Sequence, residues 1–349
     1  MNPTRFLRAA FCCTLVLLNG CNRNESSPAT ASGQAKPGKK IKIAYITNGV
    51  DPFWNTAAAG VKAAAKEFDV DADVQMPAKG IVDQKRIVES LLAGGVDGIA
   101  ISPIDAKNQV GLINEACAVT KVITHDSDAP DSKRLCFVGM DNYKAGRAAG
   151  KLVKEAIPKG GKVMLFVGRL EQLNAQQRRQ GIIDELLDRP GQALNKMNFD
   201  PPGKELAGPL YNVLDTRTDN FDYARAQANA EDAISSTPDL ACMVGLFAYN
   251  PPMCLQALKS AKKNGPIKLV AFDEQNATLQ GIIDGDIHGT VSQQPYYYGY
   301  NSVKILAGLA RGDQSALPKD GFLEVPIVQV RKDNVEKFWT ELKKLQSGN

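Results

Sequence analysis

Short apolar runs alternate along the chain with longer segments in which apolar residues recur every three or four positions. The runs are rich in Val and Ile and predict β-strands. Most of them are continuous rather than alternating, which is typical of parallel strands covered on both faces. The expected strands lie at 41–47, 73–76, 98–102, 121–124, 135–138, 162–167, 211–214, 240–246, 268–272, 289–292 and 324–330.

Helical periodicity fills the gaps between the expected strands. Segment 54–68 places Val61 and Phe68 on one face, and segment 83–92 has the same spacing of apolar residues. Alternating strands and helices indicate an α/β fold with parallel sheets. Because about eleven strands exceed what one open sheet normally holds, we expect two doubly wound, Rossmann-like lobes.

Segment 188–209 interrupts this rhythm, because it is rich in Pro, Gly and Asn. It connects a predicted helix to the next strand. Connections of that kind lie at the sheet edge opposite the carboxyl ends of the strands, where ligands bind. We therefore expect a surface excursion that stays away from any ligand cleft.

The N-terminus carries targeting signals. Arg5 and Arg8 precede an apolar run at 9–18 that is too short to span a bilayer. The Leu-Asn-Gly sequence before Cys21 resembles the lipobox of bacterial lipoproteins, in which the cysteine is lipidated and becomes the new N-terminus. We therefore expect residues 1–20 to be a lipoprotein signal peptide. A plain secretory signal with an incidental cysteine is the alternative.

Residues 21–40 contain no large apolar side chain. Such a segment cannot bury enough surface to offset its ordering entropy, so we expect a flexible tether. A folded domain is expected to begin at Ile41, and no later stretch has the length and apolarity of a transmembrane helix. The prediction is a soluble domain held outside the cytoplasm, in the periplasm, by a lipid anchor.

Composition and charge narrow the classes of function. The hydrophobic content of 44% is ordinary for a globular protein. The formal charge of +4 falls to +2 when Arg5 and Arg8 leave with the signal peptide. So small and evenly spread a charge argues against a nucleic-acid or anionic-membrane partner. Two histidines and no cysteines at ligand spacing argue against a metal site.

Seven cysteines raise the question of disulfides. Those beyond the signal peptide and the lipidated position are Cys117, Cys136, Cys242 and Cys254. An even number in an oxidising compartment favours disulfides. Cys117 lies on a predicted helix and Cys136 starts a nearby strand, so these two form the expected pair. A Cys242–Cys254 bridge is the weaker alternative, because both can also be small buried apolar groups.

Polar and aromatic side chains gather where the predicted strands end, and ligands of open parallel sheets bind outside those ends. The residues that follow the strands include Asp51, Phe53, Trp54, Asp126, Asn250, Asp273 and Gln293. Carboxylates and amides bridge hydroxyl groups, and aromatic rings cover the C–H face of a sugar. The set contains no evident nucleophile–base pair, and it therefore predicts a sugar-binding cleft.

The same segments resemble those of a known family. The motifs, in chain order, are Asp51-Pro52-Phe53-Trp54, Pro103 after the third strand, Val122-Ile123-Thr124-His125-Asp126, Val138-Gly139-Met140-Asp141-Asn142 with Ala145-Gly146, Asn174-Ala175 with Arg178 and Gly181, Ala271-Phe272-Asp273, and Val291-Ser292-Gln293-Gln294-Pro295. Each motif is weak alone. Their order over 41–330 resembles the ribose- and galactose-type periplasmic sugar-binding proteins of ABC transporters, which have the type I periplasmic binding protein fold.

The resemblance implies ligand contacts from both lobes and no cofactor. These contacts are Asp51, Phe53, Trp54, Asp126, Ser127, Gln176, Arg178, Phe221, Asn250, Asp273 and Gln293. Trp54 or Phe53 would stack on the sugar, and Asp126 would bridge its hydroxyls. Ser127 stands where ribose-binding members have an arginine, and Gln176 aligns with a second ligand-contacting arginine. The sequence therefore does not single out ribose.

The resemblance also implies a hinged molecule. Three chain crossings are expected, near 140–141, 293–294 and 322–323. The expected parts are a first lobe at 41–140 plus 294–322, a second lobe at 141–293 plus 323–332, and a helical tail at 333–349. The lobes would close on a monosaccharide. As a monomer, the closed form would deliver the sugar to the permease of an ABC transporter, which works with an ATPase.

Other functions share parts of this pattern. A periplasmic sensor that passes a sugar or furanose signal to a membrane receptor would need the same cleft, and the sequence does not separate it from transport. A glycoside hydrolase would need paired carboxylates, for which Asp126 and Asp273 are the candidates. Sugar-responsive repressors with a similar fold are excluded, because their DNA-binding helices would occupy the place of the signal and tether.

Overall fold

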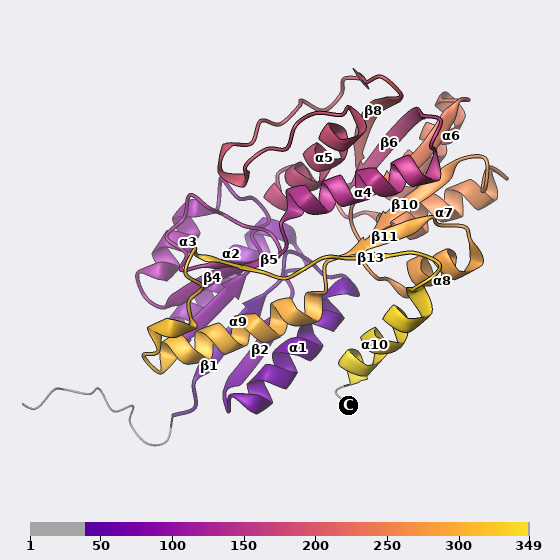
Figure 1. Ribbon diagram of the computed structural model, residues 1–349. Helices are drawn as coiled ribbons and strands as arrows, with labels where there is room; N and C mark the ends of the chain where they lie inside the picture. The colour runs from indigo at the N-terminus through magenta and orange to yellow at the C-terminus, as the bar shows by residue number, and fades with distance from the viewer. Residues whose placement is uncertain (1–38, 348–349) are drawn as a thin grey trace, which may run out of the picture. The chain divides into compact units, whose positions relative to one another are not determined.

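The computed structural model describes residues 39–347 of the 349-residue chain. The expectations for the signal peptide, for Cys21 and for most of the tether fall on residues 1–38 and lie outside the described residues. Within the described part, the strands form two sheets, each covered by helices on both faces (Figure 1). The predicted α/β class with two doubly wound lobes is confirmed.

The first lobe is built on a parallel sheet. Its strands, in order across the sheet, are β12 (Phe322–Glu324), β5 (Phe137–Gly139), β4 (Lys121–His125), β3 (Gly98–Ile101), β1 (Lys42–Ile46) and β2 (Asp71–Gln75). One face of the sheet is covered by α1 (Phe53–Glu67) and α9 (Pro295–Ala310). The other face is covered by α2 (Gly80–Ala93) and α3 (Val110–Cys117). The short helix η2 (Gln314–Ala316) follows α9. Both faces are buried, which explains the continuous apolar runs of these strands.

The second lobe contains a mostly parallel sheet with an antiparallel strand at each edge. Its strands, in order, are β13 (Val328–Val330), β11 (Gly289–Ser292), β10 (Lys268–Phe272), β9 (Leu240–Gly245), β6 (Gly161–Val167), β8 (Tyr211–Thr218) and β7 (Leu206–Ala207). One face is covered by α4 (Asn142–Ala156) and α5 (Leu173–Leu186), and the other by α6 (Tyr223–Ser236), α7 (Asn250–Ser260), α8 (Asn276–Asp284) and α10 (Val335–Ser347).

The chain passes between the sheets three times. The first two changes of sheet lie between β5 and α4 and between β11 and α9. The third was predicted at 322–323, just before what was expected to be one strand at 324–330. The structure corrects this, because Phe322–Glu324 pairs in parallel with β5 of the first sheet and Val328–Val330 pairs with β11 of the second. The chain therefore changes sheet between Glu324 and Val328.

Segment 188–209 folds back along α5 rather than pointing away from the lobes. It contains η1 (Leu194–Lys196) and the edge strand β7. The buried guanidinium of Arg179 donates to the carbonyl of Pro201 at 3.1 Å, which holds the segment against α5. Phe199 lines a surface cavity together with Pro130 of the first lobe. The predicted surface excursion therefore returns to the boundary between the lobes, although it does not line the central cavity.

The expected disulfides are absent from the described residues, where all four cysteines are free thiols. Cys136 packs in the apolar cluster under α1 and α9, whereas Cys117 packs on the opposite face of the first sheet with α2 and α3. Cys242 and Cys254 likewise belong to clusters on opposite faces of the second sheet. The prediction of a Cys117–Cys136 bridge is wrong, because a sheet separates the two side chains.

Two pairs of helices approach each other closely through glycines. In the second lobe a Cβ on Gly146 of α4 would lie 2.1 Å from the carbonyl oxygen of Arg178 on α5. In the first lobe a Cβ on Gly60 of α1 would lie 1.9 Å from the carbonyl oxygen of Tyr296 on α9. Such distances leave no room for a methyl group, so the glycines set the spacing of each pair.

Replacing Gly146 by alanine should therefore destabilise the fold. The added methyl group must push α4 from α5, and we expect the free energy of unfolding to fall by about 1–3 kcal/mol. Gly111→Ala in α3 is the matched control, since nothing lies within 4 Å of its Cβ, and alanine should leave stability equal or higher. Urea unfolding followed by circular dichroism measures both variants. Equal stability of the two variants would contradict the packing argument.

A histidine is buried at the carboxyl end of β4. His125 stacks on Tyr45 with ring centroids 3.9 Å apart, and its Nε2 lies 3.0 Å from the carbonyl oxygen of Ile46. Burial lowers the pKa of His125 from its usual 6.5 to about 3. The ring is therefore neutral, and Nε2 carries the proton that the carbonyl accepts.

This histidine should make the fold sensitive to acid. In the unfolded chain His125 takes up a proton below about pH 6.5, whereas the folded chain resists it until about pH 3. Its contribution to stability is complete above pH 6.5 and is lost as the pH falls, by on the order of 2 kcal/mol between pH 7 and pH 5. Urea unfolding at the two pH values measures the loss.

In His125→Gln, the loss of stability between the two pH values should be smaller than in the parent by on the order of 2 kcal/mol. This difference does not depend on the stability of the variant at pH 7. The chain has one other histidine, His288, which lies 3.5 Å from Glu155 at the surface of the second lobe. His288→Gln is the control and should retain the parent's loss. An unchanged loss in His125→Gln would show that other groups cause the acid sensitivity.

Candidate ligand-binding site

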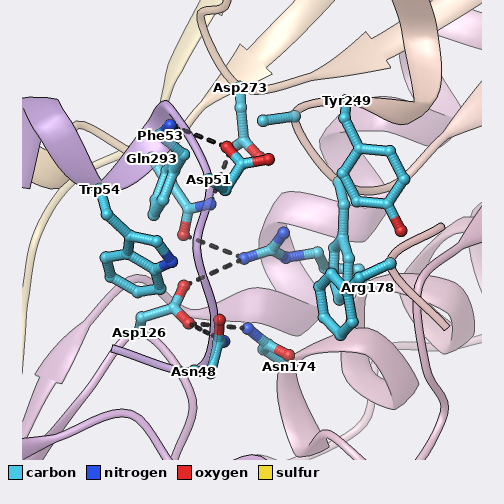
Figure 2. A pocket seen from close by; sticks show the side chains of 13 residues that line it. Asn48, Asp51, Phe53, Trp54, Asp126, Asn174, Arg178, Tyr249, Asp273 and Gln293 are labelled. Carbon is cyan, nitrogen blue, oxygen red and sulfur yellow. Dashed lines mark hydrogen bonds and ion pairs between the residues drawn. The ribbon is translucent and has the colours of Figure 1, made fainter. Parts of the chain in front are cut away.

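A cavity lies between the two lobes at the carboxyl ends of the parallel strands. The residues that line it are Asn48, Asp51, Phe53, Trp54, Asp126, Asn174, Arg178, Phe221, Phe247, Ala248, Tyr249, Asp273 and Gln293 (Figure 2). The centre of a water molecule can move through about 50 Å³ of it, whereas one buried water needs roughly 10–15 Å³. The cavity is therefore small and lined by both lobes.

The first lobe contributes one aromatic wall. Trp54 in the first turn of α1 is 2% exposed and meets Phe53 edge to face, with ring centroids 4.8 Å apart. Its other neighbours are the rings of Tyr45 and His125, at 6.4 and 5.7 Å. Oδ1 of Asp51 accepts the backbone N–H of Phe53 at 2.7 Å and fixes the start of the helix. The wall is thus held from behind by the core.

The second lobe contributes the facing aromatic wall. Phe221 stacks on Phe247 with centroids 5.7 Å apart and lies 6.0 Å from the ring of Tyr249. Asp219 behind them accepts hydrogen bonds from the Tyr249 hydroxyl and from the N–H of Phe221. Burial raises the pKa of Asp219 to about 6, and the hydrogen bonds from Tyr249 and Phe221 oppose that rise. The wall is fixed by hydrogen bonds rather than by apolar packing alone.

Asp126 is the polar centre of the first lobe. It follows β4 with a left-handed φ of 58°, which turns its side chain into the cavity. Its Oδ2 accepts hydrogen bonds from Ser102 at 2.9 Å and from Asn48 at 3.2 Å. Asn174 of the second lobe donates to the same oxygen at 3.3 Å. Burial raises the pKa of Asp126, and the charge of Arg178 opposes that rise.

Arg178 is fully buried beside this carboxylate. One terminal nitrogen of its guanidinium lies 3.8 Å from Oδ1 of Asp126 and donates to Gln293 at 2.9 Å. The remaining nitrogens donate to Asn142 at 2.9 Å and to the carbonyl of Leu246 at 3.0 Å. The guanidinium therefore connects α5 with the first two chain crossings and the end of β9.

Asp273 is the polar centre of the second lobe. It follows β10 with a φ of 69°, the same turn as at Asp126 in the other lobe. Its Oδ1 accepts a hydrogen bond from Gln293 at 2.6 Å. Burial raises the pKa of Asp273, and the charges of Asp126 and Asp51 raise it further, whereas Arg178 lowers it. A carboxylate of each lobe thus faces the same small cavity.

Eight of the eleven predicted contacts line this cavity, and three do not. The side chain of Ser127 is buried beside it, because the chain turns at Asp126. Gln176 bonds the carbonyl of Leu170 at 2.5 Å and lines the outer surface cavity. Asn250 lies behind the second wall, where it donates to Asp219 at 2.9 Å and accepts the N–H of Phe247 at 3.1 Å.

Five lining residues were not predicted as contacts. These are Asn48, Asn174, Phe247, Ala248 and Tyr249. Four of them directly follow β1 or β9, so their place at a strand end was the signal. Asn174 and Arg178 are four residues apart on α5 and share one face of the helix, which Gln176 between them cannot. That spacing was the signal for Asn174.

Comparisons with known proteins agree with this architecture. The sequence model of the periplasmic binding protein domain matches residues 43–314. A D-ribose/D-allose-binding protein of Pseudomonas aeruginosa is 26% identical over 89% of this chain and 94% of its own. A D-apiose import binding protein of Paraburkholderia graminis is 25% identical over 76% of this chain and 78% of its own.

A solved structure is similar over nearly the same length. It is an ABC transporter solute binding protein from Burkholderia graminis in complex with D-arabinose, 28% identical, with a TM-score of 0.76 over 86% of this chain and 98% of that one. Periplasmic binding proteins are non-enzymatic, which confirms the expectation that this chain is not an enzyme. Because the family match spans most of the described residues, the chain belongs to the periplasmic binding protein family.

Proposed function

We propose that this protein captures one monosaccharide by closure of its lobes and delivers it to the permease of an ABC transporter. The observation that carries the proposal is a small cavity in which carboxylates and amides of both lobes lie between two aromatic walls. Aromatic faces cover the C–H face of a sugar ring, and carboxylates accept its hydroxyl protons. The relatives named for ribose, allose and apiose support a small sugar as the solute.

The cavity favours one sugar ring over a longer saccharide. Its free volume is several times that of a single buried water and is bounded by both lobes. The hydroxyl of Tyr223 in the second lobe donates to Asp51 of the first at 2.8 Å, beside the cavity. A second ring would have to separate these groups. A hydroxyl bonded to a carboxylate in such a site is worth about 1.5–3 kcal/mol, so a few such bonds can hold the closed form.

Seven of the eight predicted contacts that line the cavity have a direct role in this proposal. Trp54 or Phe53 would stack on one face of the ring, and Phe221 on the other. Asp126 and Asp273 would accept hydroxyl protons from opposite sides. Arg178 and Gln293 would hold these carboxylates in place and donate to ring or hydroxyl oxygens.

Membership of the periplasmic binding protein family indicates a location outside the cytoplasm, but it does not indicate how the protein is held there. No helix of the described residues is long and apolar enough to cross a membrane. We propose that residues 1–20 direct export, that Cys21 carries a lipid anchor, and that the tether to residue 40 leaves the monomeric domain free to reach the permease. Tethering raises the effective concentration of the closed form at its partner.

Stacking on Trp54 can be tested with the full chain. A thermal-shift screen of pentoses, hexoses and polyols should find a sugar that raises the melting temperature, because a ligand bound to the native state alone stabilises it. Trp54→Ala should weaken the binding of that sugar by about tenfold or more, which corresponds to about 1.4 kcal/mol of lost stacking. Trp54→Phe keeps a ring and should lose less affinity.

The chain offers a matched control, because it has two tryptophans. Trp339 on α10 donates to Asn276 at 3.0 Å and does not line the cavity. Trp339→Ala should leave the affinity for the sugar unchanged in titration calorimetry. If no compound of the panel raised the melting temperature, the sugar assignment would be refuted. If Trp54→Ala bound the sugar with unchanged affinity, the stacking role would be refuted.

A further inference from the structure

The C-terminal helix α10 touches both lobes although it belongs to the second. It follows β13 of the second sheet, and its Val335 and Leu342 are buried in an apolar cluster of that lobe. Among the described residues, the apolar clusters of the first lobe include no side chain of α10. The helix nevertheless runs from α8 toward α1 and lies against both (Figure 1). It is therefore a link between the lobes in addition to the three chain crossings.

A hydrogen bond between side chains makes the link to the first lobe. The amide of Gln346, in the last turn of α10, donates to the hydroxyl of Thr56 on α1 at 2.8 Å. Thr56 is only 4% exposed, and it lies 290 residues earlier in the chain. The attachment of α10 to the second lobe is thus an apolar core, whereas its attachment to the first depends on a neutral bond.

Two grooves beside α10 show where this bond lies. Thr56 borders both of them. One groove extends to Gln294 and Val328, which lie at the second and third chain crossings. The other extends to Phe53 and Ala248, which also line the central cavity. The bond from α10 to α1 therefore lies between the crossings and the edge of the ligand cavity.

The packing of α10 over this region is loose. The centre of a water molecule can move through about 530 Å³ of one groove and 470 Å³ of the other. Glu274 lines both and is 7% exposed. One of its carboxyl oxygens accepts the hydroxyl of Ser292 at 2.7 Å, and the other has no hydrogen-bond partner among the described residues. Gaps of this size forfeit van der Waals contacts, so few interactions resist the removal of α10 from α1.

Opening of the cleft must break one attachment of α10. Rotation about the crossings moves α1 relative to the second lobe. A bond of 2.8 Å between α1 and a helix anchored in the second lobe does not survive that motion. The apolar anchor is the stronger attachment, because water competes for the neutral bond but not for the buried side chains. The bond between Gln346 and Thr56 is therefore specific to the closed form.

We propose that α10 is a strap that the closed form fastens to the first lobe, and that the bond between Gln346 and Thr56 slows release of the bound solute. Neither residue lines the central cavity, so both act on release by holding the lobes together. The effect on release rests on the proposed capture function, whereas the fastening of the lobes does not.

The first test measures sugar release from the full chain by stopped-flow fluorescence. The probe is whichever of D-ribose, D-allose, D-apiose and D-arabinose binds most tightly. Thr56→Val removes the acceptor and Gln346→Met removes the donor at nearly constant shape. Each should raise the dissociation rate by about two- to tenfold, the range for one neutral hydrogen bond. The association rate should not change, because the solute enters the open form, in which the bond is absent.

A double variant and a control separate the strap from general loosening. The double variant should release the sugar no faster than the faster single variant, because both changes remove the same bond. Thr340→Val is the matched control on α10, since its hydroxyl donates to the carbonyl of Glu336 within the helix at 2.8 Å. It should keep the parent's rates. Unchanged dissociation in both single variants, or effects that add in the double variant, would overturn the role of the bond in release.

The second test needs no sugar. Asn55 and Gln346 are exposed and line the same groove. A short bis-maleimide that joins Asn55→Cys to Gln346→Cys should hold the sugar-free chain in the closed form, so that small-angle X-ray scattering gives a smaller radius of gyration than before cross-linking. Each single cysteine variant, treated in the same way, is the control and should not become more compact. An equal radius before and after cross-linking would overturn the strap.

The two tests distinguish this inference from the proposed function. Compaction on cross-linking in a chain that binds no sugar leaves the strap standing and overturns monosaccharide capture. Sugar binding without compaction on cross-linking leaves capture standing and overturns the strap.

Discussion

The arrangement of the cleft depends on one buried guanidinium. Moving an arginine side chain out of water costs several kcal/mol unless its donors are bonded and its charge is opposed. Arg178 meets this requirement with Asn142, Leu246 and Gln293, and with Asp126 at 3.8 Å. Two of its partners lie at chain crossings, so the residue that needs these bonds also fixes where the chain leaves and enters the second lobe.

The close packing of α4 on α5 also helps to satisfy the hydrogen-bond donors of the buried Arg178. Gly146 lets α4 touch the backbone of Arg178 itself, and Asn142 at the start of α4 accepts one of its donors. The rings of Phe247 and Phe272 lie 5.6 and 5.3 Å from the guanidinium and exclude water from it. Rigid placement of Arg178 in turn fixes Gln293, which bonds Asp273. The polar centres of both lobes are thus positioned through one side chain.

Much of this architecture could be predicted from the sequence, because continuous apolar runs and strand-end residues carry strong physical signals. The prediction of contact residues failed where the local backbone geometry determines the direction of a side chain. Ser127 follows a residue with positive φ and therefore turns away from the cavity, and Gln176 lies two positions from both Asn174 and Arg178 and faces another way. Matching residue types to a family motif does not reveal the direction of either side chain.

Long-range geometry was also beyond the sequence. The run 324–330 reads as one strand, and its division between two sheets depends on which neighbours remain unpaired at each sheet edge. Cys117 and Cys136 are close along the chain, yet they pack on opposite faces of the first sheet. The pattern identifies buried positions but does not state which face of the sheet a helix covers.

Closure of the lobes depends on a few polar contacts across the cleft and on the ligand that lies between them. The bonds across the cleft that involve Asp51 with Tyr223 and Asn174 with Asp126 use neutral donors, which contribute little once water competes for the same groups. The buried ion pair of Arg178 with Asp126 also joins the two lobes, at 3.8 Å. A ligand shifts such an equilibrium only by its difference in affinity for the two states. The solute must therefore bind the closed cleft more tightly than the open one. The aromatic walls and unpaired acceptors determine where its groups are bound.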